Sequence, residues 1–211
     1  MPGQMAASTT GTGERRTQAE RSAATVDALL DATIECLVER GFGGTTTTLI
    51  SERAGVSRGA QLHHFQTRSA LVAAAVERLS ALRAEQGLAL AEELPEGPER
   101  IAAGLDLIWS GYEHPFFQAA IDLWSHARTD PELRALLVEV ERTFDRQTLE
   151  VAVRVFPDQA GKPGFERKLE MALATMRGLA LLTTLNPGSD RAAKQWKNCR
   201  AELVTIFSRE S

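Results

Sequence analysis

The sequence predicts an all-α protein with roughly nine helices. Apolar residues recur at three- and four-residue steps in one segment after another, which is the period of an amphipathic helix. Threonine, serine, aspartate or proline stands where most of these segments begin, and such residues cap or open helices. No stretch shows the sustained two-residue alternation that is typical of a half-buried strand. These observations place the chain in the all-helical class.

The helices can be placed in order from their start and stop signals. The first follows a possible capping box formed by Thr17 and Glu20, and it stops at the glycines of "GFGG". Two short helices follow within residues 46–65, and a long helix then begins at Arg68. The next helices open at prolines, and the loop "PDQAGKPG" follows the third of them; these prolines are Pro98, Pro115 and Pro131. The last two helices span about residues 165–185, ended by "NPG", and 189–208, capped by Ser189.

Composition indicates a folded protein of the reducing cytoplasm, with a small domain joined to a larger one. The chain has 211 residues, of which 43% are hydrophobic and 25% charged. Its two cysteines, Cys36 and Cys199, belong to no metal-binding spacing, and we expect no metal and no cofactor. Arg15 and Arg16 are not followed by the apolar run of an export signal. The apolar stretch "GLALLTTL" is far below the roughly 20 residues of a membrane span. We therefore expect a cytoplasmic protein that does not enter a membrane.

The net charge of -4 is unevenly distributed. Residues 1–72 hold seven arginines and seven carboxylates, so the acidic excess lies in the rest of the chain. Between Arg53 and Val72 there are three arginines and no carboxylate. This locally positive strip gives nucleic-acid binding only slight support, and an ordinary solvated face explains it at least as well.

The stretch "TTTTLISERAGVSRGAQLHHFQTRSAL", residues 45–71, has the pattern of a helix-turn-helix. Thr46 and Thr47 are suited to capping a helix of about two turns, and Gly55 can take the positive φ that ends it. Val56 then fills the turn, and Ser57 caps the second short helix. In a helix-turn-helix the second helix enters the major groove of DNA.

The second short helix carries residues suited to contact DNA. Gly59 would let its backbone approach DNA closely, and its N-terminus offers free amides to phosphate. Other side chains offer hydrogen-bond donors to bases or phosphates, namely Ser57, Arg58, Gln61 and His63, with Arg68 reaching a flanking phosphate. The alternative is an ordinary helical hairpin, in which His63 and His64 are surface residues or satisfied core residues.

With these residues in place, the sequence resembles the N-terminal domain of the TetR family of bacterial transcriptional repressors. The resemblance covers about residues 18–72, with "ERGF" before the motif and "AGVSRG" and "HHF" within it. Three residues depart from the family pattern: Ser51 replaces alanine, Leu62 replaces a tyrosine that contacts phosphate, and Arg68 replaces lysine. His63 or His64 is the expected substitute for that tyrosine contact. The expected DNA-binding set is Thr46, Thr47, Ser57, Arg58, Gly59, Gln61, His63, His64 and Arg68.

The resemblance also implies the organisation and activity of the whole chain. A flexible tail (1–14) is expected to precede the DNA-binding domain (15–66, motif about 46–65) and a ligand-binding and dimerisation domain (67–211). The family resemblance predicts a repressor released from a palindromic double-stranded operator by a small-molecule effector. The last two helices, about 165–185 and 189–208, are the expected homodimer interface. A two-fold dimer would hold its recognition helices about 34 to 36 Å apart.

The effector site can be placed only provisionally from the sequence. Five aromatic residues gather in the middle of the chain and suit a cavity for a flat or apolar ligand: Trp109, Tyr112, Phe116, Phe117 and Trp124. At helical spacing such aromatics are more often part of a core than of a cavity wall. Asp122 and His126 stand four residues apart, as a surface pair or as two ligands that lack a third.

Two other classes of function remain as alternatives. A small helical enzyme, or a ligand-binding protein that acts without DNA, would also fit the helical pattern. We expect no enzyme activity, because no nucleophile arrangement, phosphate loop or HExxH motif is visible. A purely structural helical dimer would not need a capped turn motif.

Overall fold

A computed structural model describes residues 17–185 and 190–209, and within these ranges it contains ten α-helices and no strand. The all-α prediction is confirmed. The helices are α1 (Gln18–Gly44), α2 (Thr47–Ala54), α3 (Arg58–His64), α4 (Arg68–Glu92), α5 (Glu99–Glu113), α6 (Pro115–Ala127), α7 (Pro131–Val155), α8 (Pro157–Ala160), α9 (Phe165–Leu185) and α10 (Arg191–Ser208). The predicted tail at residues 1–14 and the predicted cap Ser189 lie outside the described residues.

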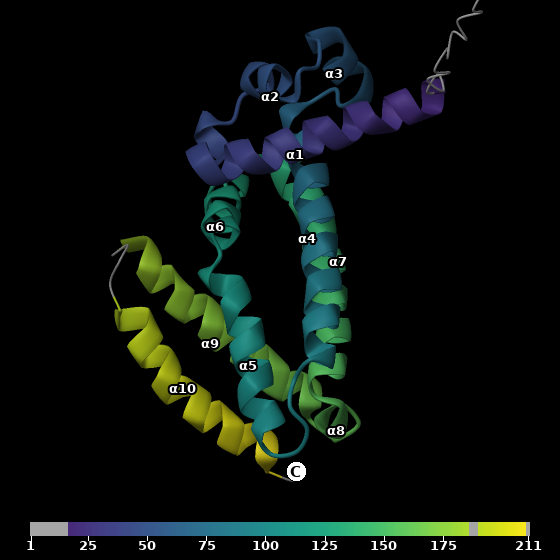
Figure 1. The fold of residues 1–211 in the computed structure, drawn as a ribbon. Coiled ribbons are helices and arrows are strands. Elements are labelled where there is room, and N and C mark those ends of the chain that lie inside the picture. The colour runs from purple at the N-terminus through teal and green to yellow at the C-terminus, as the bar shows by residue number, and fades with distance from the viewer. Residues whose placement is uncertain (1–16, 186–189, 210–211) are drawn as a thin grey trace, which may run out of the picture.

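The helices form a small three-helix unit on top of a longer helical body (Figure 1). α1 lies across the ends of α4, α6 and α7, with α2 and α3 on its outer side. α4 and α7 run side by side down the body, while α9 and α10 form a hairpin against α5. α4 therefore connects the small unit to the body without a break. Among the described residues, no helix is long and apolar enough to cross a membrane.

The small unit has a core of its own. Leu29 and Cys36 of α1, Ile50 of α2 and Leu71 of α4 are all fully buried in one cluster. Burial raises the pKa of the Cys36 thiol, which is free and packs as an apolar side chain. Ion pairs from Arg53 to Glu39 and from Arg78 to Asp27 join the surfaces of these helices.

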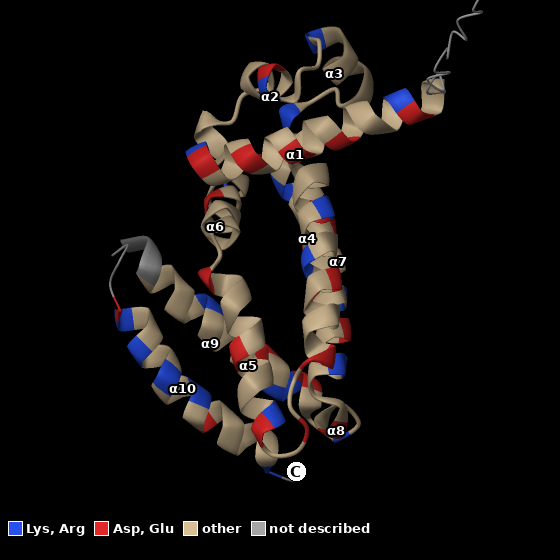
Figure 2. Ribbon diagram, in the orientation of Figure 1, with Lys and Arg blue, Asp and Glu red and all other residues tan. Residues whose placement is uncertain are grey.

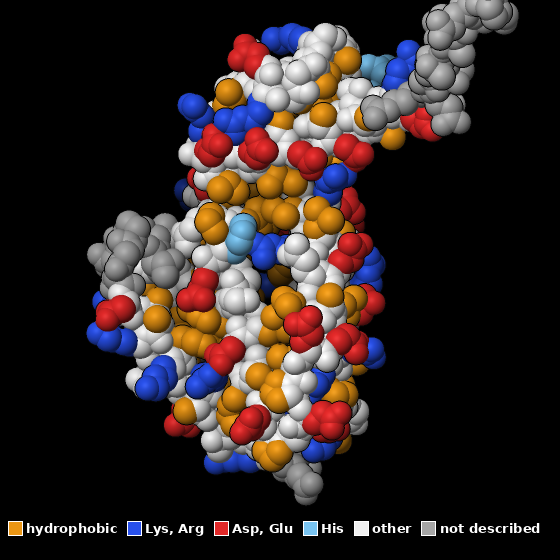
Figure 3. All heavy atoms as spheres, viewed as in Figure 1, with side chains coloured by type: hydrophobic (Ala, Val, Ile, Leu, Met, Phe, Trp, Pro, Cys, Tyr) orange, Lys and Arg blue, Asp and Glu red, His pale blue; other side chains and the backbone are white. Residues whose placement is uncertain are grey.

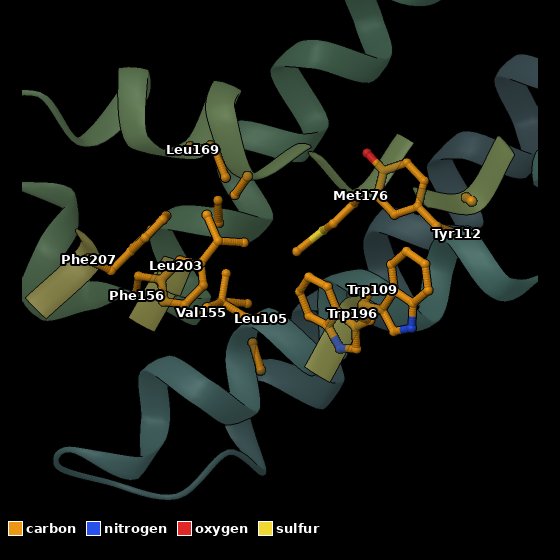
Figure 4. Packing of buried hydrophobic residues seen from close by; sticks show 14 of the residues in the cluster. Leu105, Trp109, Tyr112, Val155, Phe156, Leu169, Met176, Trp196, Leu203 and Phe207 are labelled. Atoms are coloured by element: carbon orange, nitrogen blue, oxygen red, sulfur yellow. The ribbon is translucent and has the colours of Figure 1, made fainter. Parts of the chain in front are cut away.

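A second core lies in the body and extends from Phe207 at its far end to Tyr112 on α5 (Figure 4). Phe156 and Phe207 lie within it, 5.0 Å apart between ring centroids. Arg100 ties the helix ends together around this core, because its guanidinium donates to the carbonyl oxygens of Ala91 and Val155 at 3.0 and 2.9 Å. These contacts fix α5 against the C-terminal ends of α4 and α7.

Local signals in the sequence placed most helix ends. The capping box at Thr17 is present, as are the caps at Thr46, Ser57, Thr67 and Asp130. The segment that was predicted as the loop "PDQAGKPG" contains the single-turn helix α8. Proline at its first position suits a helix start, but one turn carries too little periodicity to be recognised.

Candidate nucleic-acid interface and ligand cavity

The helix-turn-helix forms as the sequence predicts. Thr46 accepts a hydrogen bond from the Leu49 amide at 3.2 Å, and Ser57 accepts one from the Ala60 amide at the same distance. Gly55 has φ 64° and ψ 28°, the left-handed conformation that closes α2. Val56 packs on the core of the small unit and fixes the turn. The two short helices are thereby held in a defined relation at the outer end of the molecule.

One face of α3 is exposed. Arg58, Gly59, Leu62 and His63 are all exposed, and Leu62 keeps 45% of its surface accessible. His63 and His64 pack edge to face, with ring centroids 5.1 Å apart. A Cβ built on Gly59 would meet no heavy atom within 4 Å, so no neighbour in this structure requires glycine there. Figure 2 shows little charge on this outer end of the molecule.

Gln61 lies on the opposite face of α3 and does not fit the expectation that it reads bases. Only 1% of its surface is exposed, and its Nε2 donates to the carbonyl oxygen of Phe65 at 2.7 Å. Its Oε1 is buried without a hydrogen-bond partner among the described residues. Gln61 faces inward although its neighbour Leu62 is exposed, because the packing of α3 on α1 decides which face is covered.

Arg68 likewise differs from the expectation of a phosphate contact. Its Nη1 donates to the carbonyl oxygen of Thr45 at 3.2 Å and lies 3.5 Å from that of Phe42, and its guanidinium lies 3.9 Å from the Phe42 ring centroid. It therefore fastens the end of α1 to the start of α4. Arg53 pairs with Glu39 and Glu35. Of the three arginines in the positive strip, Arg58 alone has neither an ion pair nor a hydrogen bond in the described structure.

Asp122 and His126 take part in the junction between the small unit and the body. Asp122 accepts a hydrogen bond from the Phe42 amide at 2.5 Å, and its Oδ1 lies 3.3 Å from His126 Nδ1. The Phe42 and His126 rings are 5.0 Å apart. No third His, Cys, Asp or Glu in the described ranges completes a metal site here. The pair holds α6 against the end of α1.

A cavity of about 230 Å³ lies in the body between the α4–α7 pair and helices α5, α6 and α9. Figure 3 shows a hollow on this face, bordered mainly by hydrophobic side chains. Aromatic and aliphatic side chains make most of the wall, including Val76, Leu90, Ile108 and Phe144. The cavity is therefore suited to a compact, largely apolar ligand.

Four of the five predicted aromatics line this cavity, and the fifth does not. Tyr112, Phe116, Phe117 and Trp124 form part of its wall. Trp109 is 4% exposed and stacks on Trp196, with ring centroids 5.0 Å apart (Figure 4), in the same core cluster that includes Tyr112 and Phe117. Trp109 is one helical turn from Tyr112, but α10 covers it, and no local pattern in the sequence distinguishes the two.

Polar groups also reach the cavity wall. Arg177 lies near the Tyr112 hydroxyl, and its Nη2 is 4.0 Å from Asp145 Oδ1. Burial raises the pKa of Tyr112, and the positive charge of Arg177 partly opposes that rise. Trp124 donates through Nε1 to Glu141 at 2.8 Å. Arg83 lines the cavity from the middle of α4. Sequence reasoning missed Arg83 and Arg177, because arginine at helical spacing ordinarily marks a solvated face.

Comparisons with known proteins agree with the helix-turn-helix geometry. Residues 29–75 match the family model described as bacterial regulatory proteins of the tetR family. The chain is 35% identical over 133 residues to the HTH-type transcriptional regulator CymR of Pseudomonas putida, which covers 63% of this chain and 64% of that protein. Residues 29–75 therefore form a DNA-binding domain of the TetR family. The match spans just under two thirds of the length of CymR. The chain is also 28% identical to the HTH-type transcriptional repressor AcnR of Corynebacterium diphtheriae, over 58% of this chain and 60% of that protein.

Solved structures extend the likeness of fold over the body of the chain. A putative TetR-family regulator from Mesorhizobium loti has a TM-score of 0.66 at 19% identity, covering 89% of this chain and 96% of that one. A TetR regulator from Haloarcula marismortui has a TM-score of 0.64 at 16% identity, covering 87% of this chain and 98% of that one. At these identities the comparison shows a shared fold. It says nothing about which residues line the cavity.

Proposed function

We propose that this protein is a TetR-family transcriptional repressor that binds a palindromic DNA operator and is released by a small-molecule effector. The exposed face of α3 carries the proposal. It combines Arg58 and His63 as polar contacts with Gly59, which adds no side chain between the helix backbone and a groove wall. The names of CymR, a transcriptional regulator, and AcnR, a transcriptional repressor, support the same class.

The proposed DNA contacts are the exposed members of the set that the sequence predicts. Thr46, Ser57 and Arg58 suit the phosphate backbone, while Gly59 and His63 suit a groove. Thr47 and His64 are partly exposed and complete the set. The burial of Gln61 and the internal contacts of Arg68 support leaving both out of direct readout.

The proposed roles of the two domains follow from their separate hydrophobic cores, one in the small unit and one in the body. We assign DNA binding to residues 15–66 and effector binding and dimerisation to residues 67–211, with α4 as the connection. α6 supports a coupling role, since Phe116 and Trp124 line the cavity while Asp122 holds the end of α1. An effector with different affinities for two positions of α6 would shift the population of DNA-binding molecules.

A homodimer through α9 and α10 is supported by a stripe along α9. Met171 and Leu181 keep 41% and 46% of their surfaces exposed, and Ala174 and Gly178 between them are also exposed. Spacings of three, four and three residues place all four on one helix face. A two-fold axis through this face would pair the stripe with itself in the second copy, with the small residues allowing close approach.

DNA binding is tested with purified protein and DNA from the region upstream of its own gene, in a gel-shift assay with competitor DNA. A sequence-dependent shift that weakens as salt rises is expected. Arg58→Ala should weaken the shift, and Arg142→Ala, which removes an exposed arginine from α7, is the matched control. If competitor DNA of any sequence abolished the shift to the same extent, binding would not depend on sequence, and the proposal would be contradicted.

The dimer is tested by analytical ultracentrifugation of full-length variants. Leu181→Lys places a charge in the α9 stripe and should produce monomers. Val153→Lys is the matched control, because Val153 is 45% exposed on α7, outside the stripe. Equal dimer content in both variants would place the interface elsewhere.

A further inference from the structure

Arg83 is a cation at a cavity wall without a compensating partner. It belongs to the face of α4 that lines the cavity, together with Val76, Ser80 and Gly87. The side chain is partly buried and has no ion pair or hydrogen bond within the described part of the chain. Removing a charge from water without a partner is unfavourable, so an anion at this position would be bound favourably.

The other charged groups of the wall are already engaged. Arg177 lies beside Asp145 and the Tyr112 hydroxyl, and Glu141 accepts the indole hydrogen bond of Trp124. Burial, and secondly the positive charge of Arg83, lower the pKa of His114 at the junction of α5 and α6. The positive charge of Arg83 therefore acts on His114, which lies at the junction of α5 and α6.

Gln147 offers a second polar group near the level of Arg83. Gly87 faces Val151, and Glu92 pairs with Arg154, so α4 and α7 run parallel with residues about 62 to 64 positions apart at the same level. This register places Arg83 beside Gln147. The Oε1 of Gln147 is buried and has no hydrogen-bond partner among the described groups. A carboxamide can rotate to present either its oxygen or its NH₂ to a ligand.

The remaining wall and the volume limit the rest of the ligand. Tyr112, Phe116, Phe117 and Trp124 provide aromatic surface. An apolar cavity of about 150 Å³ holds benzene. The cavity of about 230 Å³ therefore suits one aromatic ring with a short arm.

We propose that the cavity binds a compact aromatic carboxylate, with its ring against the α5–α6 aromatics and its carboxylate paired with Arg83 and hydrogen-bonded by Gln147. This inference rests on the proposed function only in taking the cavity as the effector site. It adds the chemical class of the effector, an apolar monoanion, and the residue that selects it.

Three probes that share one skeleton test the proposal by isothermal titration calorimetry at pH 7: 3-phenylpropanoate, 3-phenylpropanamide and 3-phenylpropylamine. The carboxylate should bind more tightly than the amide by a factor of about ten to a hundred, the usual range for a charge-assisted hydrogen bond. Arg83→Met should reduce the affinity for the carboxylate to that for the amide and leave the amide unchanged. Arg146→Met is the matched control, because Arg146 is exposed on α7 next to Gln147 in the sequence.

Several results would overturn the proposal: no heat from the carboxylate at millimolar concentration, equal binding of all three probes, or an unchanged carboxylate affinity in Arg83→Met. Preference for the amine would overturn it in favour of a cation held by Glu141. If Arg83→Met fails to fold, the comparison of the three probes on the wild-type protein still decides. The titration contains no DNA, so a failed gel shift would leave the site standing. Arg83-dependent binding that releases no DNA would count against the proposed effector mechanism alone.

Discussion

The carboxylate of Asp122 accepts a hydrogen bond from the backbone amide of Phe42 at 2.5 Å, across 80 residues of sequence. Phe42 lies in the last turn of α1, and Asp122 lies in the middle of α6. The guanidinium carbon of Arg68 lies 3.9 Å from the centroid of the Phe42 ring. Phe42 of the small unit is thus held by two charged side chains. Asp122 of α6 contacts its backbone amide, and Arg68 of α4 contacts its ring.

Removing the Asp122 carboxylate should loosen this junction. Asp122→Ala leaves the Phe42 amide without its acceptor and should lower the free energy of unfolding by about 1 kcal/mol, a modest value because the side chain is partly exposed. Asp122→Asn keeps an oxygen acceptor and should lose less. Urea unfolding measures both, and Glu139→Ala, which breaks an exposed ion pair on α7, is the control. Equal losses in all three variants would contradict a specific role.

Gly41 should be far less tolerant of a side chain than Gly55. Gly41 has φ 63° and ψ 179°, a region almost restricted to glycine, and an added Cβ would lie 2.8 Å from Asp122 Oδ2. Gly55 has a left-handed conformation, and nothing lies within 4 Å of an added Cβ. We expect Gly55→Ala to cost about 1 kcal/mol and Gly41→Ala about 3 kcal/mol in thermal or urea unfolding. Equal costs would show that the contact with Asp122 is unimportant.

Arg68 should contribute to stability and not to the salt dependence of DNA binding. Arg68→Met removes its hydrogen bonds to backbone carbonyl oxygens and its charge over the Phe42 ring, with an expected loss of about 1 to 2 kcal/mol. The slope of log affinity against log salt should stay unchanged, whereas Arg58→Met should reduce it by about one unit. A reduced slope in Arg68→Met would restore the phosphate contact that the sequence suggested.

Gly59→Ala should separate stability from DNA binding. Alanine in a helix is more stable than glycine by about 0.5 to 1 kcal/mol, and the added methyl group meets no neighbour in this structure. The melting temperature should rise while affinity for the operator falls, because the methyl group would keep α3 from a groove wall. Gly161→Ala, in an equally open position at the end of α8, should leave DNA binding unchanged. Unaltered affinity in Gly59→Ala would exclude close approach at this point.

His114 should make stability depend on pH. Its Nδ1 accepts the Phe116 amide at 3.2 Å and caps α6, which requires an unprotonated nitrogen. Its pKa is lowered below the ordinary 6.5, so the unfolded chain takes up the proton first, and stability falls as pH drops from 6.5 through the folded value. Loss of the cap is worth about 0.5 to 1 kcal/mol. Unfolding experiments between pH 7 and 5 should show a weaker pH dependence in His114→Asn, which keeps a capping oxygen.

Local patterns in the sequence determined the helical class, most helix ends and the helix-turn-helix. A cap such as Ser57 acts on an amide three residues away, and a turn glycine such as Gly55 acts on its own φ, so both can be predicted from short stretches. The apolar period of α1 is similarly local. These features depend on neighbours within one or two turns of helix, and the sequence presents those neighbours directly.

Only the tertiary structure decided which polar residues face outward and which face a cavity. Gln61 and His63 are two positions apart, yet one is buried and the other exposed, because α1 covers one face of α3. Arg68 contacts the end of α1, and Arg83 lines a cavity whose other walls come from α5, α6, α7 and α9. Burial and pairing of these side chains depend on helices brought together from distant parts of the chain, and helical spacing alone carries no information about that packing.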